Sequence, residues 1–183
     1  VDGTGSTGRM DARSFAISLA TSLIFIADEY NCKIRTATLT GAPTLATAVG
    51  IAGECFAVDG SAANVRCVGP RTIYPLYVAK GDYMLFGEYE LVRKVRTSDF
   101  FTVTIAGDTE SSSVSSGLPF NVYFGSVWGI ATVPGVLDDA NAVVYLAVNV
   151  NARLRKYERG YVLGLISATS GTVDGTGSGA RWD

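Results

Sequence analysis

Very few side chains in this sequence are suited to catalysis. The 183 residues contain no histidine, which excludes Ser-His-Asp and Cys-His nucleophiles as well as His-ligated metal sites. The cysteines are Cys32, Cys55 and Cys67, and none of them forms the Cys-x-x-Cys pair that often holds zinc. A cysteine nucleophile would need a base that no histidine supplies here. We therefore predict that the chain is not an enzyme and that it carries no cofactor.

Calcium is the metal that the remaining residue types could bind. Asp138, Asp139 and Asn141 lie close together and offer carboxylate and amide oxygens. The same residue types are typical of hairpin turns, where their side chains satisfy the neighbouring backbone. Two interpretations of this segment therefore stay open, a calcium site and a turn between two strands.

Arginine recurs at Arg35, Arg93 and Arg155, each within a predicted strand. The planar guanidinium could bind anions at the surface, or it could bridge neighbouring units to a carboxylate or carbonyl oxygen. Lys94 and Arg96 extend Arg93 into the strongest basic stripe of the chain, and these three are candidate binding residues. Acidic residues interleave with the stripe, no aromatic side chains for base stacking accompany it, and the formal net charge is −2. A nucleic-acid partner is therefore disfavoured.

Two tyrosines, Tyr30 and Tyr89, fall in predicted loops between strands. Loops at the ends of a rigid scaffold commonly carry binding groups, which makes both residues candidates for contact with a partner. The alternative is a purely structural role, because aromatic side chains also fill the cores of small sheets.

The composition indicates a folded, water-exposed chain without a membrane helix. Hydrophobic residues make up 48% of the sequence and charged residues 17%, which is too apolar and too weakly charged for a disordered chain. The longest apolar stretch, residues 15–27, is interrupted by serine and threonine and is too short to span a bilayer. No membrane segment is predicted.

The sequence repeats itself. The hexapeptide at residues 1–6 returns at residues 173–178, and shortened copies begin at Val58 and Val114. A second landmark agrees, because residues 26–35 align without gaps on residues 146–155 and more loosely on residues 86–93. In this alignment Val122 stands opposite Arg9 and Arg66. Three units and the start of a fourth are predicted, at residues 1–57, 58–113, 114–172 and 173–183.

Each unit contains four short runs rich in Val, Ile, Tyr and Phe, separated by Gly, Asp and Asn turns, which is the pattern of an all-β protein. The predicted strands are residues 15–19, 23–27, 32–39 and 47–52, then 73–78, 83–86, 91–96 and 101–106, then 128–133, 143–148, 153–157 and 161–166. Four antiparallel strands in a repeated unit predict the blades of a β-propeller.

The repeat resembles the NHL-repeat β-propellers. The resemblance rests on Asp-Gly followed by arginine at residues 2–9 and 59–66, Ala27-Asp28 at the end of a strand, and Lys33-Ile34-Arg35 in the next. The third unit departs from the pattern, because it lacks Asp-Gly and has Val148 where the first unit has Asp28. The units are also longer than the usual propeller repeat of about 40 to 45 residues.

The resemblance implies blades that belong to a closed ring, usually of six. Three blades would leave two apolar blade faces exposed, so we expect either a longer array in the same chain or a second copy of the chain to cover them. The implied function is a non-catalytic binding or scaffold module that presents loops to a protein partner. The alternative is a propeller lyase or lactonase type of enzyme with an all-oxygen calcium site.

The cysteines predict the cellular compartment. Cys32 opens the third predicted strand of the first blade, and Cys55 follows the fourth. Adjacent antiparallel strands bring the start of one beside the end of the next, so we predict a Cys32–Cys55 disulfide and an extracellular or cell-surface location. Cys67 is expected to pack in the core. The alternative is a cytoplasmic protein with three buried thiols.

Overall fold

The computed structural model describes residues 1–78, 81–109, 116–133, 142–149 and 152–167. Two of the sequence predictions fall on other residues and lie outside the described part of the chain. They are the calcium or turn segment with Asp138, Asp139 and Asn141, and the start of a further blade at residues 173–183.

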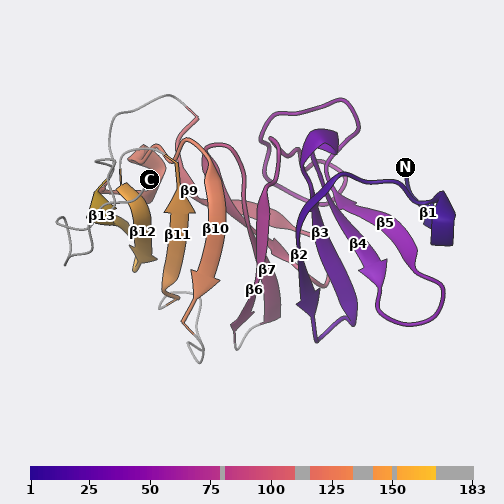
Figure 1. Cartoon of the computed structure of the whole chain (residues 1–183). Coiled ribbons are helices and arrows are strands. Elements are labelled where there is room, and N and C mark those ends of the chain that lie inside the picture. Colours follow the sequence, from indigo (N-terminus) through magenta and orange to yellow (C-terminus); the bar gives the residue numbers. More distant parts are fainter. Residues whose placement is uncertain (79–80, 110–115, 134–141, 150–151, 168–183) are drawn as a thin grey trace.

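The described residues form three antiparallel sheets, each built from strands that are consecutive in the sequence (Figure 1). The first contains β2 (Ala12–Ser18), β3 (Leu23–Asp28), β4 (Lys33–Thr38) and β5 (Thr44–Val49), with the short β1 (Gly3–Thr4) added beside β5. The second contains β6 (Thr72–Val78), β7 (Gly81–Gly87), β8 (Leu91–Arg96) and β9 (Thr102–Gly107). The third contains β10 (Val127–Thr132), β11 (Val144–Val148), β12 (Ala152–Glu158) and β13 (Tyr161–Ser167). The prediction of an all-β protein with four-stranded antiparallel blades is confirmed.

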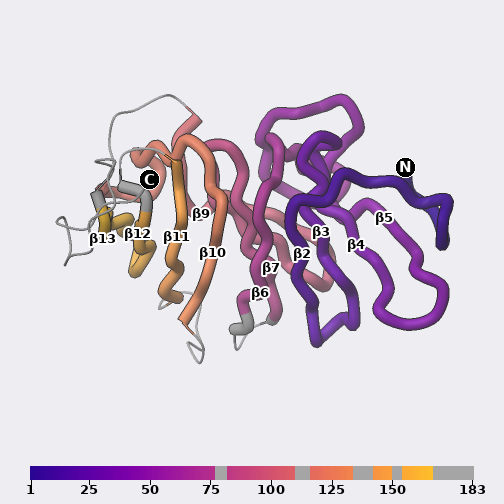
Figure 2. The backbone as a smooth tube through the Cα atoms, in the orientation of Figure 1, coloured from indigo at the N-terminus to yellow at the C-terminus, as the bar shows by residue number. Residues whose placement is uncertain are grey.

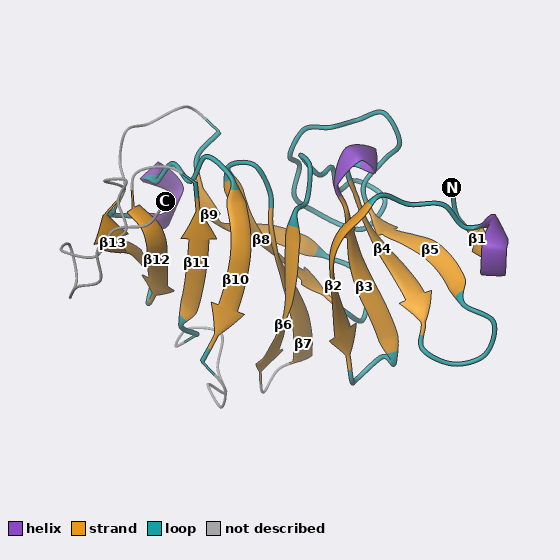
Figure 3. Ribbon diagram, viewed as in Figure 1, coloured by secondary structure: helices purple, strands orange, loops and turns teal. Residues whose placement is uncertain are grey.

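Helical structure in the described residues is limited to short 3-10 turns in the connections (Figure 3). These are η1 (Gly5–Thr7), η2 (Glu29–Asn31) and η3 (Pro119–Asn121). We call each sheet together with the segment that leads into it a blade.

The fourth strand of the first blade lies earlier than the sequence predicts. It begins at Thr44 and ends at Val49, because Gly50 adopts φ +100° and a side chain there would overlap the Cys32 carbonyl oxygen. Gly107 ends β9 in the same way, with φ +111° and the Glu90 carbonyl oxygen against it. At both positions the glycine lets the fourth strand of the sheet end and change direction beside the first residues of the third strand.

The blades stack through their inner strands, with β6 lying between β2 and β10 (Figures 1 and 2). The side chains of β7 alternate between two cores: Met84 and Phe86 pack toward the first sheet, and Leu85 packs toward the third. Such two-sided burial explains why β7 reads as an almost continuous apolar run.

A leading segment fills the gap between neighbouring sheets. Val65 and Cys67 are buried between the first and second sheets, and Val122 and Phe124 are buried between the second and third. Val122 is therefore the counterpart of Val65. The sequence alignment, which sets Val122 opposite Arg66, is wrong by one residue. The short repeats around residue 122 share too few letters with the second blade to fix their register.

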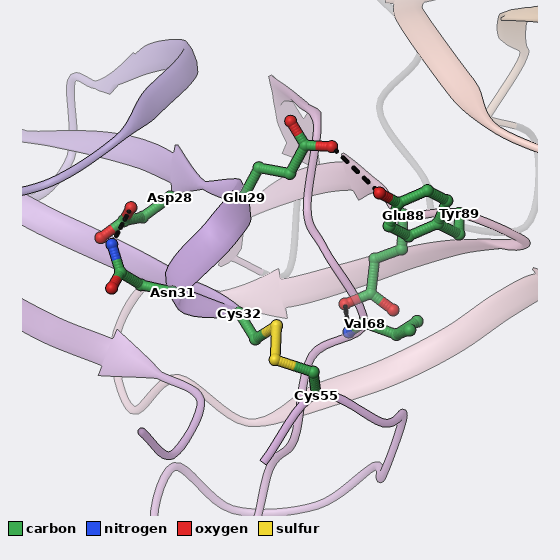
Figure 4. The surroundings of a disulfide bond; sticks show 8 residues. All are labelled: Asp28, Glu29, Asn31, Cys32, Cys55, Val68, Glu88 and Tyr89. Carbon is green, nitrogen blue, oxygen red and sulfur yellow. Dashed lines mark hydrogen bonds between the residues drawn. A yellow bond between two sulfur atoms is a disulfide. The ribbon is translucent and has the colours of Figure 1, made fainter. Parts of the chain in front are cut away.

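The predicted disulfide is present. Cys32 bonds to Cys55, with the two Cα atoms 5.4 Å apart (Figure 4). Cys32 does not open β4, however; it is the residue after η2 and adopts the left-handed conformation, with φ 53°. Cys67 is a buried free thiol, and burial, together with the nearby Glu88 carboxylate, raises its pKa well above the usual value.

The state of the three cysteines can be counted chemically. We expect no reaction of the native chain with Ellman's reagent, because Cys67 is buried and its raised pKa suppresses the thiolate. Unfolding without reductant should expose one thiol, and reduction should expose three. Three thiols before reduction would contradict the disulfide.

Candidate functional site

The repeated arginines Arg35, Arg93 and Arg155 are fully buried, not displayed at the surface. Each donates a hydrogen bond from Nη1 to a main-chain carbonyl of the segment that leads into its own sheet. The acceptors are Arg9, Arg66 and Tyr123, at 3.5, 2.6 and 2.7 Å. The arginine therefore fastens the third strand of each blade to that blade's own leading segment, which is a bridge within one unit and differs from the bridge between neighbouring units that the sequence suggested.

Carboxylates neutralise this arginine in the first two blades. Asp28 and Asp2 lie 3.2 and 2.6 Å from the Arg35 guanidinium. In the second blade, Glu88 and Asp59 lie 3.3 and 2.9 Å from Arg93.

Asp2 and Asp59 come from the repeated Asp-Gly pairs. Those pairs therefore supply a charge partner as well as a turn. Asp59 also accepts a hydrogen bond from the Thr104 amide at 2.8 Å, so it links the leading segment to the outer strand β9.

Burial sets the protonation behaviour of the second network. It raises the pKa of Glu88, and Arg93 opposes that shift. Burial also works against the charge on Arg93, but Glu88 and Asp59 outweigh it and the pKa of Arg93 is raised. The acids therefore favour the charged form of Arg93, whereas at Glu88 burial outweighs the attraction of Arg93.

The third blade keeps the arginine and changes its surroundings. Val148 occupies the place of Asp28, and Ser116 takes the place of Asp59, accepting from the Gly164 amide at 2.8 Å. The Gly117–Val162 bridge matches the Gly60–Thr102 bridge, so Ser116, and not Ser115, is the counterpart of the aspartate. Burial lowers the pKa of Arg155 to about 10.

The basic stripe of the second blade, Arg93, Lys94 and Arg96, is partly buried and partly exposed. Arg93 is enclosed, whereas Arg96 lies at the surface in a two-point ion pair with Asp99, at 2.8 and 2.5 Å. Hydrogen bonding from Arg96 lowers the pKa of Asp99 to about 2. Lys94 points to the opposite face from Arg93, with its ammonium 4.9 Å from the centre of the Tyr83 ring. The three cations do not form one continuous basic surface.

The two candidate tyrosines do belong to one cluster, which joins the three blades. We call it the Glu29 cluster, and it consists of Arg13, Glu29, Tyr30, Arg71, Tyr89 and Trp128. Figure 4 shows Glu29 and Tyr89 pointing toward each other from neighbouring blades, beside the disulfide.

Equivalent positions in or directly before the inner strands supply three members of this cluster. In each blade the second strand lies between the inner strand and the third strand, which carries the buried arginine. The register across these strands places the arginine in line with one residue of the inner strand. These residues are Phe15 for Arg35, Ile73 for Arg93 and Ile130 for Arg155. Two residues ahead of these stand Arg13, Arg71 and Trp128. In the first and third blades the register shifts at this point, so Arg13 and Trp128 are bulged out of the strand. β-bulges commonly redirect a side chain in this way, and they recur beside functional sites.

Glu29 is the centre of the cluster and is only 4% exposed. One carboxylate oxygen pairs with Nε of Arg13. The other lies 2.8 Å from Nε of Arg71 and accepts a 3.4 Å hydrogen bond from the Tyr89 hydroxyl. A single buried acid therefore holds side chains from two blades.

Aromatic rings enclose the two guanidinium groups. The Arg71 guanidinium carbon lies 4.2 Å from the centre of the Tyr89 ring and 4.9 Å from that of Trp128. Arg13 lies 5.1 Å from the Tyr30 ring centre and donates to its hydroxyl at 2.7 Å. Tyr30, Tyr89 and Trp128 remain exposed on their outer sides. Cation–π contacts of this kind fix the plane of the arginine.

A cavity of about 320 Å³ opens here, lined by Arg13, Glu29, Arg71 and Trp128. These side chains offer charge and aromatic surface but no thiol or hydroxyl nucleophile. Within the described residues there is also no group of three His, Cys, Asp or Glu side chains placed to hold a metal ion.

Sequence reasoning found Tyr30 and Tyr89 but missed Arg13, Glu29, Arg71 and Trp128. A signal was present, because Arg13 and Arg71 stand the same number of residues ahead of Arg35 and Arg93. Glu29 and Tyr89 likewise each follow the buried acid of their blade. The bulge that brings Trp128 into the same position leaves no mark in the sequence.

No known protein family and no curated protein matches this chain. Among the described residues, no helix is long and apolar enough to cross a membrane.

The buried arginine can be tested in the second blade. Arg93→Met removes one partner of a fully buried ion pair, and we expect the free energy of unfolding to fall by about 3 to 5 kcal/mol. The matched control is Arg96→Met on the same strand, whose ion pair is exposed and should matter little. Urea unfolding followed by tryptophan fluorescence gives both values. Equal effects of the two substitutions would contradict the structural role of Arg93.

Proposed function

We propose that this chain is a non-catalytic binding module and that the Glu29 cluster is where a protein partner docks. The observation that carries the proposal is the convergence of three blades on one spot. Each inner strand, or the residue directly before it, contributes one large side chain there, and the adjoining loops add Tyr30 and Tyr89.

The composition of the cluster supports a protein partner. Trp, Tyr and Arg are the residues that most often dominate the energy of protein–protein interfaces. Trp128 is 60% exposed, and Tyr30 and Tyr89 are also exposed, so aromatic surface is available to a partner. The cavity beside them has room for a side chain.

The rigidity of the cluster supports the same proposal. Glu29 holds Arg13 and Arg71 by ion pairs, and the two arginines hold the rings in turn. Side chains that are fixed before binding lose less conformational entropy when a partner arrives. An exposed arginine and tyrosine without such contacts would not have this advantage.

The proposal extends to architecture and location. We interpret the blades as part of an NHL-like β-propeller, a resemblance supported by the repeated Asp-Gly, its ion pair with the buried arginine, and the four-stranded sheets. The Cys32–Cys55 disulfide supports an extracellular or cell-surface location, since such bonds persist in oxidising compartments.

Further blades are the second partner that we propose. Ile73 and Cys67 are buried against the first sheet, and Ile130 and Phe124 against the second. The corresponding residues of the first blade are Phe15 and Met10. Phe15 lies in register with Arg35 across the second strand, and Met10 follows Arg9, whose carbonyl accepts from Arg35.

Phe15 and Met10 are exposed to solvent, with exposed fractions of 69% and 48%. We therefore propose that another blade of the same kind covers this face.

The docking proposal is tested by substituting Trp128. A partner is first identified by cross-linking to the exposed cluster among secreted and surface proteins of the source organism. We expect Trp128→Ala to weaken its binding by about thirtyfold in calorimetry, the fold-change of a typical hot spot. Phe101→Ala is the control, because Phe101 is also exposed but lies at the opposite end of β8 from Tyr89. Equal affinities for both variants would overturn the proposal.

The exposed blade face is tested by the mass in solution. Light scattering should show that the chain self-associates, and Phe15→Glu should lower the mass because a charge cannot be buried against another blade. Phe101→Glu serves as the control and should leave the mass unchanged. A chain that is monomeric at every concentration would contradict an interface on this face.

A further inference from the structure

We propose that Arg13 and Arg71 together bind a carboxylate, and that an acidic side chain of the protein partner provides it. This inference rests on the proposed docking function of the Glu29 cluster and names the chemical group that the cavity accepts.

Glu29 engages both arginines through the same edge. Nε of Arg13 pairs with one carboxylate oxygen, and Nε of Arg71 lies 2.8 Å from the other. A guanidinium carries five N–H donors, of which Nε supplies one. The terminal nitrogens of both residues are therefore left for other acceptors.

The terminal nitrogens are only partly used. Arg13 donates through Nη2 to the Tyr30 hydroxyl at 2.7 Å. Within the described part of the chain, no group accepts a hydrogen bond from the terminal nitrogens of Arg71. Arg71 is nevertheless largely buried, with 19% of its side chain exposed. The terminal nitrogens reach solvent, so a ligand oxygen can take the place of water there.

Two aromatic rings lie against the Arg71 guanidinium, so a ligand can contact this group by hydrogen bonds to its edge. The Tyr89 and Trp128 rings both lie within 5 Å of its guanidinium carbon. Aromatic rings take the faces of the planar group, and oxygen acceptors take its edge. A carboxylate matches the fork of an arginine with two parallel hydrogen bonds, which is the strong geometry for such a pair.

The charge balance of the cavity favours an anion. Its lining contains two guanidinium groups and one carboxylate, so one positive charge is in excess. A single ligand carboxylate would neutralise it. The cavity, at about 320 Å³, has room for a side chain.

A protein acid fits this site better than a nucleic acid. A nucleic-acid backbone binds to an extended basic surface, and the formal net charge of the chain is −2. The other arginines of the second blade are enclosed, as Arg93 is, or paired with an acid, as Arg96 is. In this cavity two guanidinium groups accompany one carboxylate, an excess of positive charge that suits one ligand carboxylate.

The test uses a matched pair of small probes, N-acetyl-glutamate amide and N-acetyl-glutamine amide, with inorganic phosphate as a third. NMR of the arginine Nε–Hε groups reports binding at Arg13 and Arg71. We expect saturable shifts with the glutamate probe at about millimolar affinity, and none with the glutamine probe. A response to phosphate alone would overturn the carboxylate inference.

Variants of Arg71 complete the test. Arg71→Gln should weaken the glutamate probe by about tenfold or more, and Arg71→Lys should weaken it less, because lysine keeps the charge but loses the fork. Arg96→Gln is the control and should bind the probe normally. Thermal unfolding confirms that each variant is folded. Unchanged probe binding by Arg71→Gln would overturn the inference.

The outcomes separate this inference from the proposed function. If Trp128→Ala abolishes partner binding while the glutamate probe produces no shifts, the carboxylate site is overturned and the docking function stands. If the probe binds at Arg71 while the partner ignores Trp128→Ala, the docking function is overturned and the carboxylate site stands.

Discussion

The buried guanidinium on the third strand of each blade is the interaction on which the rest of the fold depends. A charge in this position is costly unless hydrogen bonds and opposite charges surround it. The leading segment supplies a carbonyl to Arg35, Arg93 and Arg155, and in the first two blades it also supplies the aspartate of Asp-Gly. The segment is therefore held in the gap between sheets, where its alternate residues complete the apolar core.

The same constraint positions the cavity. Asp28 turns inward to Arg35, and its neighbour Glu29 reaches outward to Arg13 and Arg71. In the second blade Glu88 turns inward, and the adjacent Tyr89 reaches the same cluster. Of two consecutive residues, the first contacts the buried arginine of its blade and the second belongs to the Glu29 cluster. The geometry of the cavity follows from the geometry of the buried network.

The strands and the disulfide could be predicted because they depend on local patterns. Alternation of apolar residues located β6, β8, β11 and β13 within two residues of their observed bounds, and strand order brought Cys32 to Cys55. The Glu29 cluster could not be predicted in full, because it is made by contacts between blades and by two bulges. A register shift of one residue at Trp128 depends on sheet geometry, which single letters do not encode.

The middle sheet has a consequence for how such a chain can be divided. Because β7 sends alternate side chains into two different cores, neither core belongs to one sheet. A cut between blades would bisect a core and not separate two finished ones. The apolar contacts that stabilise the chain therefore lie at the junctions between neighbouring sheets, and each sheet needs the next one to complete its core.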